Sequence, residues 1–195
     1  MHKPFPYLIH TFDIGGFTER ENEFSKFVYG ERRKNVGNVR SNRGGWQSGM
    51  SYGDSDDSLS TFIKEEVVRY IQSMDMLRSN VKGCFRELWY NINGRDSYNV
   101  MHSHPDSHLS GVFWIKTPKD SGELVFFHPN AFNCATEYQW YKDEYRDMYG
   151  LYAHIAITPM PGRMVLFPSY LYHRVERNNS RQDRISCSFN LKFLS

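Results

Sequence analysis

The second half of the chain consists of short runs of aromatic and branched residues that turn-forming residues separate. Runs of this length and composition are typical of β-strands, and Gly, Pro, Asn and Asp are typical of the turns between them. Many such strands in succession predict a β-sandwich or jelly roll. The expected strands are residues 84–92, 97–104, 108–116, 123–128, 153–158, 163–167 and 184–193.

Two helices are expected before residue 80. Thr18-Glu-Arg-Glu21 is a capping box and predicts a short helix that ends at Gly30. Apolar residues recur at helical spacing over residues 59–77 and predict a longer helix, capped by one of residues 56–58. The polar, glycine-rich residues 31–56 predict an irregular loop between the two helices.

Helices followed by strands define an α+β fold. The chain has 195 residues, which fits a single domain with a sizeable core. We expect one domain, residues 1–195, with a helical N-terminal part over about residues 1–80 and a jelly-roll core over about residues 81–195. The N-terminal helices should pack on one sheet of that core.

Charge, hydropathy and cysteine usage restrict the class of partner. There are 24 Lys and Arg against 22 Asp and Glu, so the net charge of +2 does not indicate nucleic acid. No run approaches the roughly 20 apolar residues of a membrane span, and the first residues lack the apolar core of a secretory signal. The widely spaced Cys84, Cys134 and Cys187 are typical of reduced thiols, which favours the cytoplasm. The sequence leaves open whether the chain forms a homodimer.

A cluster of metal-capable side chains lies at the end of one expected strand, in His102-Ser-His104-Pro-Asp106. Alternate residues of a strand point to the same face, so either His102 with His104 or His104 with Asp106 can bind one ion. A distant His173 would complete a three-ligand site with open positions, which suits non-haem Fe(II).

The last expected strand has one apolar and one polar face. Arg184 and Ser186 lie on its polar face, shortly after His173. Such a face is ordinarily solvated, but in a jelly roll it can instead line the space between the sheets. There an Arg could bind a dicarboxylate through paired hydrogen bonds.

Taken together, these motifs resemble the 2-oxoglutarate- and Fe(II)-dependent oxygenases, specifically a bacterial and phage group of unknown substrate. The resemblance covers most of residues 44–190 and implies a double-stranded β-helix, the cupin-like form of the jelly roll. It rests on Gly44–Ser48, Trp89–Asn91, Tyr98–Asn99, His102–Pro105, Ser107–Trp114, Gly162–Pro168, His173 and Arg184–Asn190.

The resemblance leaves two ligand sets open. The usual superfamily pattern, His-x-Asp, selects His104, Asp106 and His173. The group resembled here has His-x-His-Pro, which selects His102, His104 and His173. A turn at Pro105-Asp106 between two strands favours the second set, and a site of three His would carry one negative charge fewer.

The resemblance also implies a reaction. Fe(II), 2-oxoglutarate and dioxygen would oxidise an unknown substrate, by default through hydroxylation, with release of succinate and CO2. Arg184 and Ser186 are the expected ligands of the far carboxylate of 2-oxoglutarate, and Ser110 and Tyr98 are weaker candidates. The alternatives are a metal-binding jelly roll or cupin-like protein without enzymatic activity, and a dioxygenase with three His ligands that does not use 2-oxoglutarate.

Other conspicuous residues have simpler interpretations. His108 and His128 are expected not to bind metal. The basic residues of 32–43 are most simply a solvated loop, although they could recognise a phosphate. The aromatic residues of 138–149 could form a lid, but aromatic cover for a sheet is more common.

Overall fold

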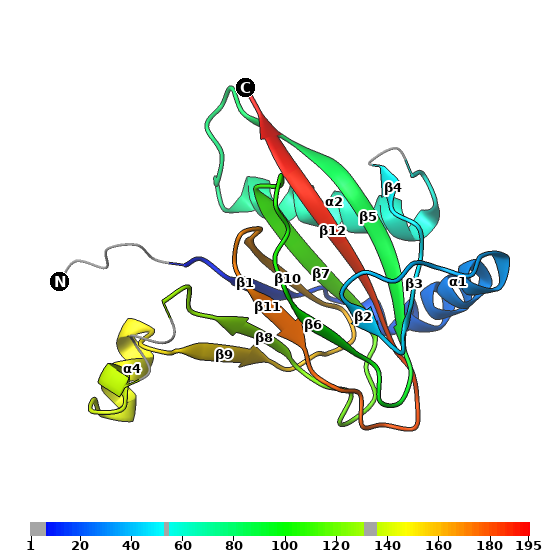
Figure 1. Ribbon diagram of the computed structural model, residues 1–195. Helices are drawn as coiled ribbons and strands as arrows, with labels where there is room; N and C mark the ends of the chain where they lie inside the picture. The colour runs from blue at the N-terminus through cyan, green and yellow to red at the C-terminus, as the bar shows by residue number, and fades with distance from the viewer. Residues whose placement is uncertain (1–6, 53–54, 131–135) are drawn as a thin grey trace.

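Two antiparallel β-sheets face each other, and helices cover the outer side of the larger sheet (Figure 1). The structure is a computed structural model and describes residues 7–52, 55–130 and 136–195. Within these ranges the larger sheet has seven strands in the order β1-β10-β7-β12-β5-β3, with β4 also paired to β5. They are β1 (His10–Asp13), β3 (Trp46–Gln47), β4 (Ser51–Tyr52), β5 (Lys82–Asn93), β7 (Leu109–Lys116), β10 (Arg163–Pro168) and β12 (Arg184–Leu194).

The smaller sheet has the order β2-β6-β11-β8-β9. Its centre is the three-residue β11, in which His173 pairs with His102 on one side and with Phe126 on the other. Its strands are β2 (Asn42–Arg43), β6 (Tyr98–His102), β8 (Leu124–Phe127), β9 (His154–Ile157) and β11 (His173–Val175). The two sheets form the predicted jelly roll, and the α+β class is confirmed.

The helices pack on the larger sheet, as predicted. α1 (Glu21–Lys34) contacts β5 and β7, and α2 (Ser58–Ser73) contacts β5. Phe24 and Ile63 belong to the same buried cluster as Phe113 and Phe189. A second, smaller cluster fills part of the space between the two sheets; it contains Trp114, Leu124, Phe126, Val165, Phe167 and Leu171.

The two helix starts differ from each other. Asp57 caps α2 as predicted, because its side chain accepts hydrogen bonds from the backbone N–H groups of Leu59 and Ser60. The predicted capping box at Thr18 is wrong: Thr18 lies in a short 3-10 helix, η1 (Phe17–Glu19), and α1 begins after Arg20 without a side-chain cap.

The first helix does not end at Gly30, contrary to the prediction, but continues to Lys34. A glycine inside a helix costs only about 1 kcal/mol, and burial of Phe24 and Val28 on the sheet offsets that cost. The second helix ends at Ser73, earlier than the apolar pattern indicated.

The N-terminal part is not purely helical. β1 forms an edge of the larger sheet by pairing with β10, and β2, β3 and β4 lie in residues predicted as an irregular loop. α4 (Asp143–Tyr149), also unpredicted, lies in a segment that projects from the sheets (Figure 1). Among the described residues, no helix is long and apolar enough to cross a membrane.

Candidate active site

Three histidines from two neighbouring strands of the smaller sheet meet in one place. His102 ends β6, His104 follows it by two residues, and His173 begins β11 and pairs directly with His102. One ring nitrogen from each lies within 4.8 Å of the other two, which suits a single metal ion. The alternation of side chains along β6 brings His102 and His104 to the same side, as the sequence predicted.

Backbone carbonyl groups orient two of these rings. Nδ1 of His102 lies 2.8 Å from the carbonyl oxygen of Val100, and Nδ1 of His173 lies 2.9 Å from that of Leu171. A carbonyl oxygen only accepts hydrogen bonds, so each Nδ1 carries the proton and each Nε2 keeps a lone pair for a metal. Nε2 of His102 also lies 3.4 Å from Oγ of Ser41.

Burial keeps the three rings neutral. It lowers the pKa of His102, lowers that of His104 to about 4 and lowers that of His173 to about 3. The repulsion between neighbouring imidazolium charges lowers the last two further. At neutral pH all three are therefore in the form that binds a metal ion.

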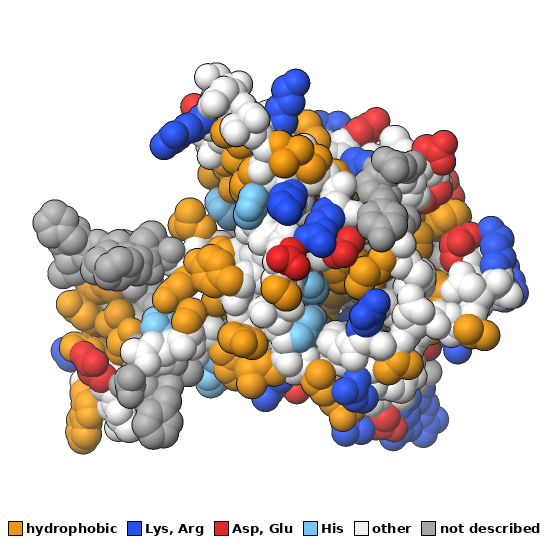
Figure 2. Space-filling model, turned by 45° about the horizontal axis from the view of Figure 1, so that its top comes forward, with side chains coloured by type: hydrophobic (Ala, Val, Ile, Leu, Met, Phe, Trp, Pro, Cys, Tyr) orange, Lys and Arg blue, Asp and Glu red, His pale blue; other side chains and the backbone are white. Residues whose placement is uncertain are grey.

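A cavity of about 620 Å³ between the sheets joins the histidines to the polar face of β12. Arg184, Ser186, Ser188 and Asn190 all line it, whereas Ile185, Cys187 and Phe189 face the core below the helices. The polar face of this strand is therefore not solvated in the ordinary way but looks into the cavity. In Figure 2, histidine side chains lie beside a hollow in the surface.

Arg184 closes the inner end of this cavity. Its side chain is 2% exposed, and it donates hydrogen bonds from Nη1 to the carbonyl oxygens of Ser121, Gly122 and Glu176. Burial lowers its pKa to about 10, so it stays cationic at neutral pH. Among the described residues, no carboxylate lies within ion-pair distance of it.

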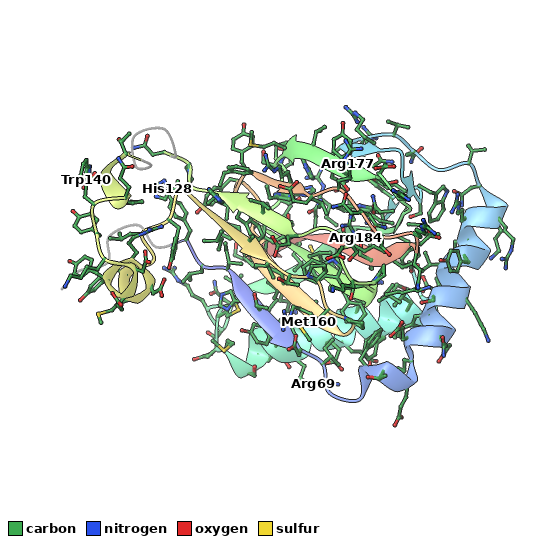
Figure 3. All side chains as sticks on the ribbon, turned by 90° about the horizontal axis from the view of Figure 1, so that it is seen from below. Arg69, His128, Trp140, Met160, Arg177 and Arg184 are labelled. Carbon is green, nitrogen blue, oxygen red and sulfur yellow. The ribbon has the colours of Figure 1, made fainter. Side chains whose placement is uncertain are left out.

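The loop that holds Arg184 requires a glycine. Gly122 has a φ of +87°, which L side chains rarely adopt, and a Cβ there would collide with the backbone of Glu176 and Arg177. This close approach brings three carbonyl groups to one guanidinium. Figure 3 shows Arg184 among the strands of the two sheets.

Three of the predicted site residues lie apart from this arrangement. Asp106 is exposed, in a turn with a φ of +69°, and is not among the side chains grouped around the metal position. Ser110 is buried and bonded to Asn190 and Ser169, and it does not line the cavity. Tyr98 is also absent from the lining; its ring packs under the guanidinium of Arg177.

The remaining conspicuous residues are mostly distant. Nδ1 of His108 accepts a hydrogen bond from the backbone of Phe193, and neither His108 nor His128 belongs to the metal group. Trp140 is 82% exposed on the projecting segment, away from Arg184, so it neither covers a sheet nor closes the cavity (Figure 3). Cys134 lies outside the described residues.

Several lining residues were not predicted. Trp89 lies with its ring centroid 5.7 Å from that of His104, and Glu87, Asn91 and Asn93 line the cavity from the same face of β5. Arg40 lines it at the surface. Trp89 and Asn91 belong to a stretch that carries the family resemblance, but neither the resemblance nor the alternation with Leu88, Tyr90 and Ile92 indicated a role for these β5 residues in the cavity.

The comparisons with known proteins agree with this geometry. A model of the family described as "Putative 2OG-Fe(II) oxygenase" matches residues 87–190, more than half of the chain. No curated protein sequence matches the chain.

Solved structures of similar fold come from several organisms. A prolyl-4-hydroxylase of Pseudomonas putida has a TM-score of 0.66 at 13% identity, over 95% of this chain and 92% of that one. A collagen prolyl hydroxylase of Paramecium bursaria Chlorella virus-1, solved with 2OG, has a TM-score of 0.61 at 12% identity, over 94% of each chain. HygX of Streptomyces hygroscopicus, solved with nickel and 2-oxoglutarate, has a TM-score of 0.60 at 9% identity, over 95% and 82%.

At these identities the structures show the fold, and the family model shows the family. Fe(II), 2-oxoglutarate and dioxygen are the reactants that this family uses, and the substrate is unknown. The chain belongs to the 2-oxoglutarate- and Fe(II)-dependent oxygenases.

Proposed function

We propose that His102, His104 and His173 hold the iron and that Arg184, assisted by Ser186, binds the far carboxylate of 2-oxoglutarate. One observation carries this assignment: a buried guanidinium, to which the described part of the chain offers no carboxylate partner, shares a cavity with three neutral imidazoles. A buried cation is costly unless an anion or hydrogen bonds offset its lost hydration. Three carbonyls do so in part, and a bound dicarboxylate would supply the missing charge.

The positions of the side chains favour the ligand set without Asp106. The Asp106 carboxylate is exposed in the turn after His104, while the Nε2 atoms of His102 and His173 face the shared metal position. Three neutral ligands leave the full charge of Fe(II) on the site. The carboxylate of 2-oxoglutarate nearer to the iron would then offset part of that charge, while the far carboxylate would pair with Arg184.

Spacing along β12 supports the division of roles. Ser188 pairs with Trp89, whose ring lies against His104, so the metal position is level with Ser188. Arg184 lies four residues away, roughly 14 Å along the strand. Ser186 lies between them on the same face and can donate a hydroxyl hydrogen bond to a ligand that bridges the two.

The chain's own residues bind, orient and shield the reactants. Bound iron with 2-oxoglutarate would supply the activation of dioxygen, with succinate, CO2 and a hydroxylated substrate as the products. Arg184 fixes one end of the co-substrate, and Phe167, Leu124 and Val175 exclude water from the inner part of the cavity.

Titration of 2-oxoglutarate into the anaerobic Fe(II) protein tests the assignment of Arg184. Arg184→Ala should weaken 2-oxoglutarate by about 3–5 kcal/mol, since a carboxylate is left buried without its partner. Arg184→Lys keeps the charge but loses the paired geometry, so a smaller loss is expected. Iron binding should survive in both, and unchanged 2-oxoglutarate affinity in Arg184→Ala would remove Arg184 from this role.

Iron stoichiometry tests the ligand set separately. The unaltered protein should bind about one Fe(II) per chain, and His104→Ala or His173→Ala should abolish binding. Asp106→Ala is the matched control, because it removes the one competing ligand and should leave the stoichiometry unchanged. Loss of iron in Asp106→Ala would restore the set that contains a carboxylate.

A further inference from the structure

The outer end of the cavity contains a carboxylate with no cation beside it. Glu87 lines the cavity and is partly buried. Among the described residues, no Lys, Arg or His nitrogen lies within 4.0 Å of it. Arg40 lines the same cavity but is not paired with it. A half-buried carboxylate loses part of its hydration, so a cation that binds there would be favoured.

A chain of buried hydrogen bonds holds Glu87 in place. The Ser110 hydroxyl donates to Oδ1 of Asn190 at 2.7 Å, which fixes the orientation of that amide, and Nδ2 of Asn190 donates to Oε2 of Glu87 at 2.7 Å. The Ser169 hydroxyl, 2.8 Å from Oγ of Ser110, completes the chain. Ser169, Ser110 and Asn190 are each at most 2% exposed. Among the residues that the structure describes, none donates a hydrogen bond to the other carboxylate oxygen, Oε1.

Glu87 and the proposed 2-oxoglutarate site at Arg184 lie on opposite sides of the metal position. Cavity-facing pairs follow one another along β5 and β12: Arg184 with Asn93, Ser186 with Asn91, Ser188 with Trp89, and Asn190 with Glu87. The metal position is level with Trp89. Glu87 therefore lies one step beyond it, roughly 7 Å along the strand, on the opposite side from Arg184.

This side of the metal position is also where the cavity opens. Among the lining residues, Arg40 and Pro105 are exposed, and Pro105 directly follows His104. Arg184, by contrast, is closed off from solvent. A substrate that enters from the surface thus meets Glu87 before it reaches the iron, and Trp89 lies beside it on the same face. Indole rings attract cations through their faces, which adds to the preference of the carboxylate.

We propose that Glu87 binds a cationic group of the substrate, an ammonium or guanidinium, while the carbon to be oxidised lies at the metal position. This proposal rests on the proposed function, because it places the substrate opposite 2-oxoglutarate. Ser110, which does not line the cavity, acts as a positioning residue, because it orients the Asn190 amide that holds the carboxylate. The substrate class is therefore a basic amine or guanidine with an oxidisable carbon a few bonds from its charge.

Matched small probes test the charge preference without knowledge of the full substrate. Ligand-observed NMR would measure the affinity of n-butylammonium and of its uncharged counterpart n-butanol for protein loaded with Zn(II) and 2-oxoglutarate. The amine should bind at least about tenfold more tightly than the alcohol, which corresponds to about 1.4 kcal/mol. Glu87→Gln, which preserves shape, should abolish that ratio, and Ser110→Ala should reduce it because the Asn190 amide is then free to turn.

A control variant and an internal signal separate the outcomes. Glu65→Gln removes the same charge from the exposed surface of α2 and should leave the amine-to-alcohol ratio unchanged. The 2-oxoglutarate signals in the same sample report on the co-substrate site. If 2-oxoglutarate binds but the amine shows no preference, no binding, or a preference that Glu87→Gln keeps, the proposal is overturned. If 2-oxoglutarate itself does not bind, the proposed function fails instead.

Discussion

The two faces of β12 show how one strand serves stability and chemistry separately. Ile185, Cys187 and Phe189 are fully buried against the helices, while Arg184 and Ser186 are almost as buried but face the cavity. Burial alone therefore does not distinguish them. The difference is that the first face packs apolar groups, whereas the second face keeps polar groups that the protein only partly satisfies.

Truncation of the core face should have the largest effect on stability. Phe189 is completely buried. Its ring packs against the ring of Phe85 and against Gly111, where a Cβ would collide with it. Phe189→Ala should lower the free energy of unfolding by about 3–5 kcal/mol, because it removes apolar contacts and leaves a cavity. Urea unfolding measures the loss, and Ser188→Ala on the opposite face is the control. A loss below about 1 kcal/mol in Phe189→Ala would contradict the comparison.

Adjacent residues should respond in opposite ways to small changes. Cys187→Ser puts a hydroxyl into the apolar core and should cost about 1–3 kcal/mol of stability with no change in 2-oxoglutarate affinity. Ser186→Ala should leave stability unchanged and weaken 2-oxoglutarate by about 0.5–1.5 kcal/mol, the net contribution of one hydrogen bond. Thermal unfolding and 2-oxoglutarate titration on both variants would show whether the two faces are independent. A shared effect on both quantities would break the comparison.

Asp57, the cap of α2, should have a smaller effect on stability, and this effect should depend on pH. Burial tends to raise the pKa of Asp57, but hydrogen bonds from Ser55, Ser60 and Tyr90 outweigh it, so the net pKa is lowered. A lowered carboxyl pKa stabilises the fold above its unfolded value of about 4, and this stability is lost as the pH falls through the folded pKa.

Asp57→Ala should therefore cost about 0.5–2 kcal/mol at neutral pH, through the lost helix cap, and less in acid. Urea unfolding at neutral pH and below pH 4 measures both values. Glu65→Gln on the exposed face of the same helix should show no such difference. An Asp57→Ala cost that stays constant as the pH falls would show that the carboxylate charge contributes little.

The sequence predicts secondary structure well where one clear pattern of residues covers the whole element. The strands from β5 to β12 that are longer than three residues were expected within two residues of their bounds, because each is a run of aromatic and branched residues between clear turn signals. β11 was missed because three residues carry too little pattern, and β1 was missed because its sequence, His-Thr-Phe-Asp, contains only one apolar residue. The prediction that the first helix ends at Gly30 was wrong because helix propensity is a local property, whereas packing on the sheet decides whether the helix continues.

The same contrast applies to the site. We could predict His102, His104 and the distant Arg184 as site residues because all three belong to the motifs that carry the family resemblance. The pairing of His173 with His102 and the hydrogen-bond chain to Glu87 depend on register between distant strands, which no local pattern contains. The expectation that nucleic acid is not a partner stays a prediction. Whether the chain forms a homodimer stays open.

The order of the strands has a consequence for synthesis of the chain. β12 lies between β7 and β5 in the middle of the larger sheet and pairs with β5 over its whole length, yet it follows all the other strands in sequence. A ribosome-bound chain therefore lacks the centre of its main sheet until residues 184–194 have emerged. Pairings between such distant segments form slowly. Until then β5 and β7 both present unpaired edges, so we expect the nascent chain to depend on chaperones more than the finished protein does.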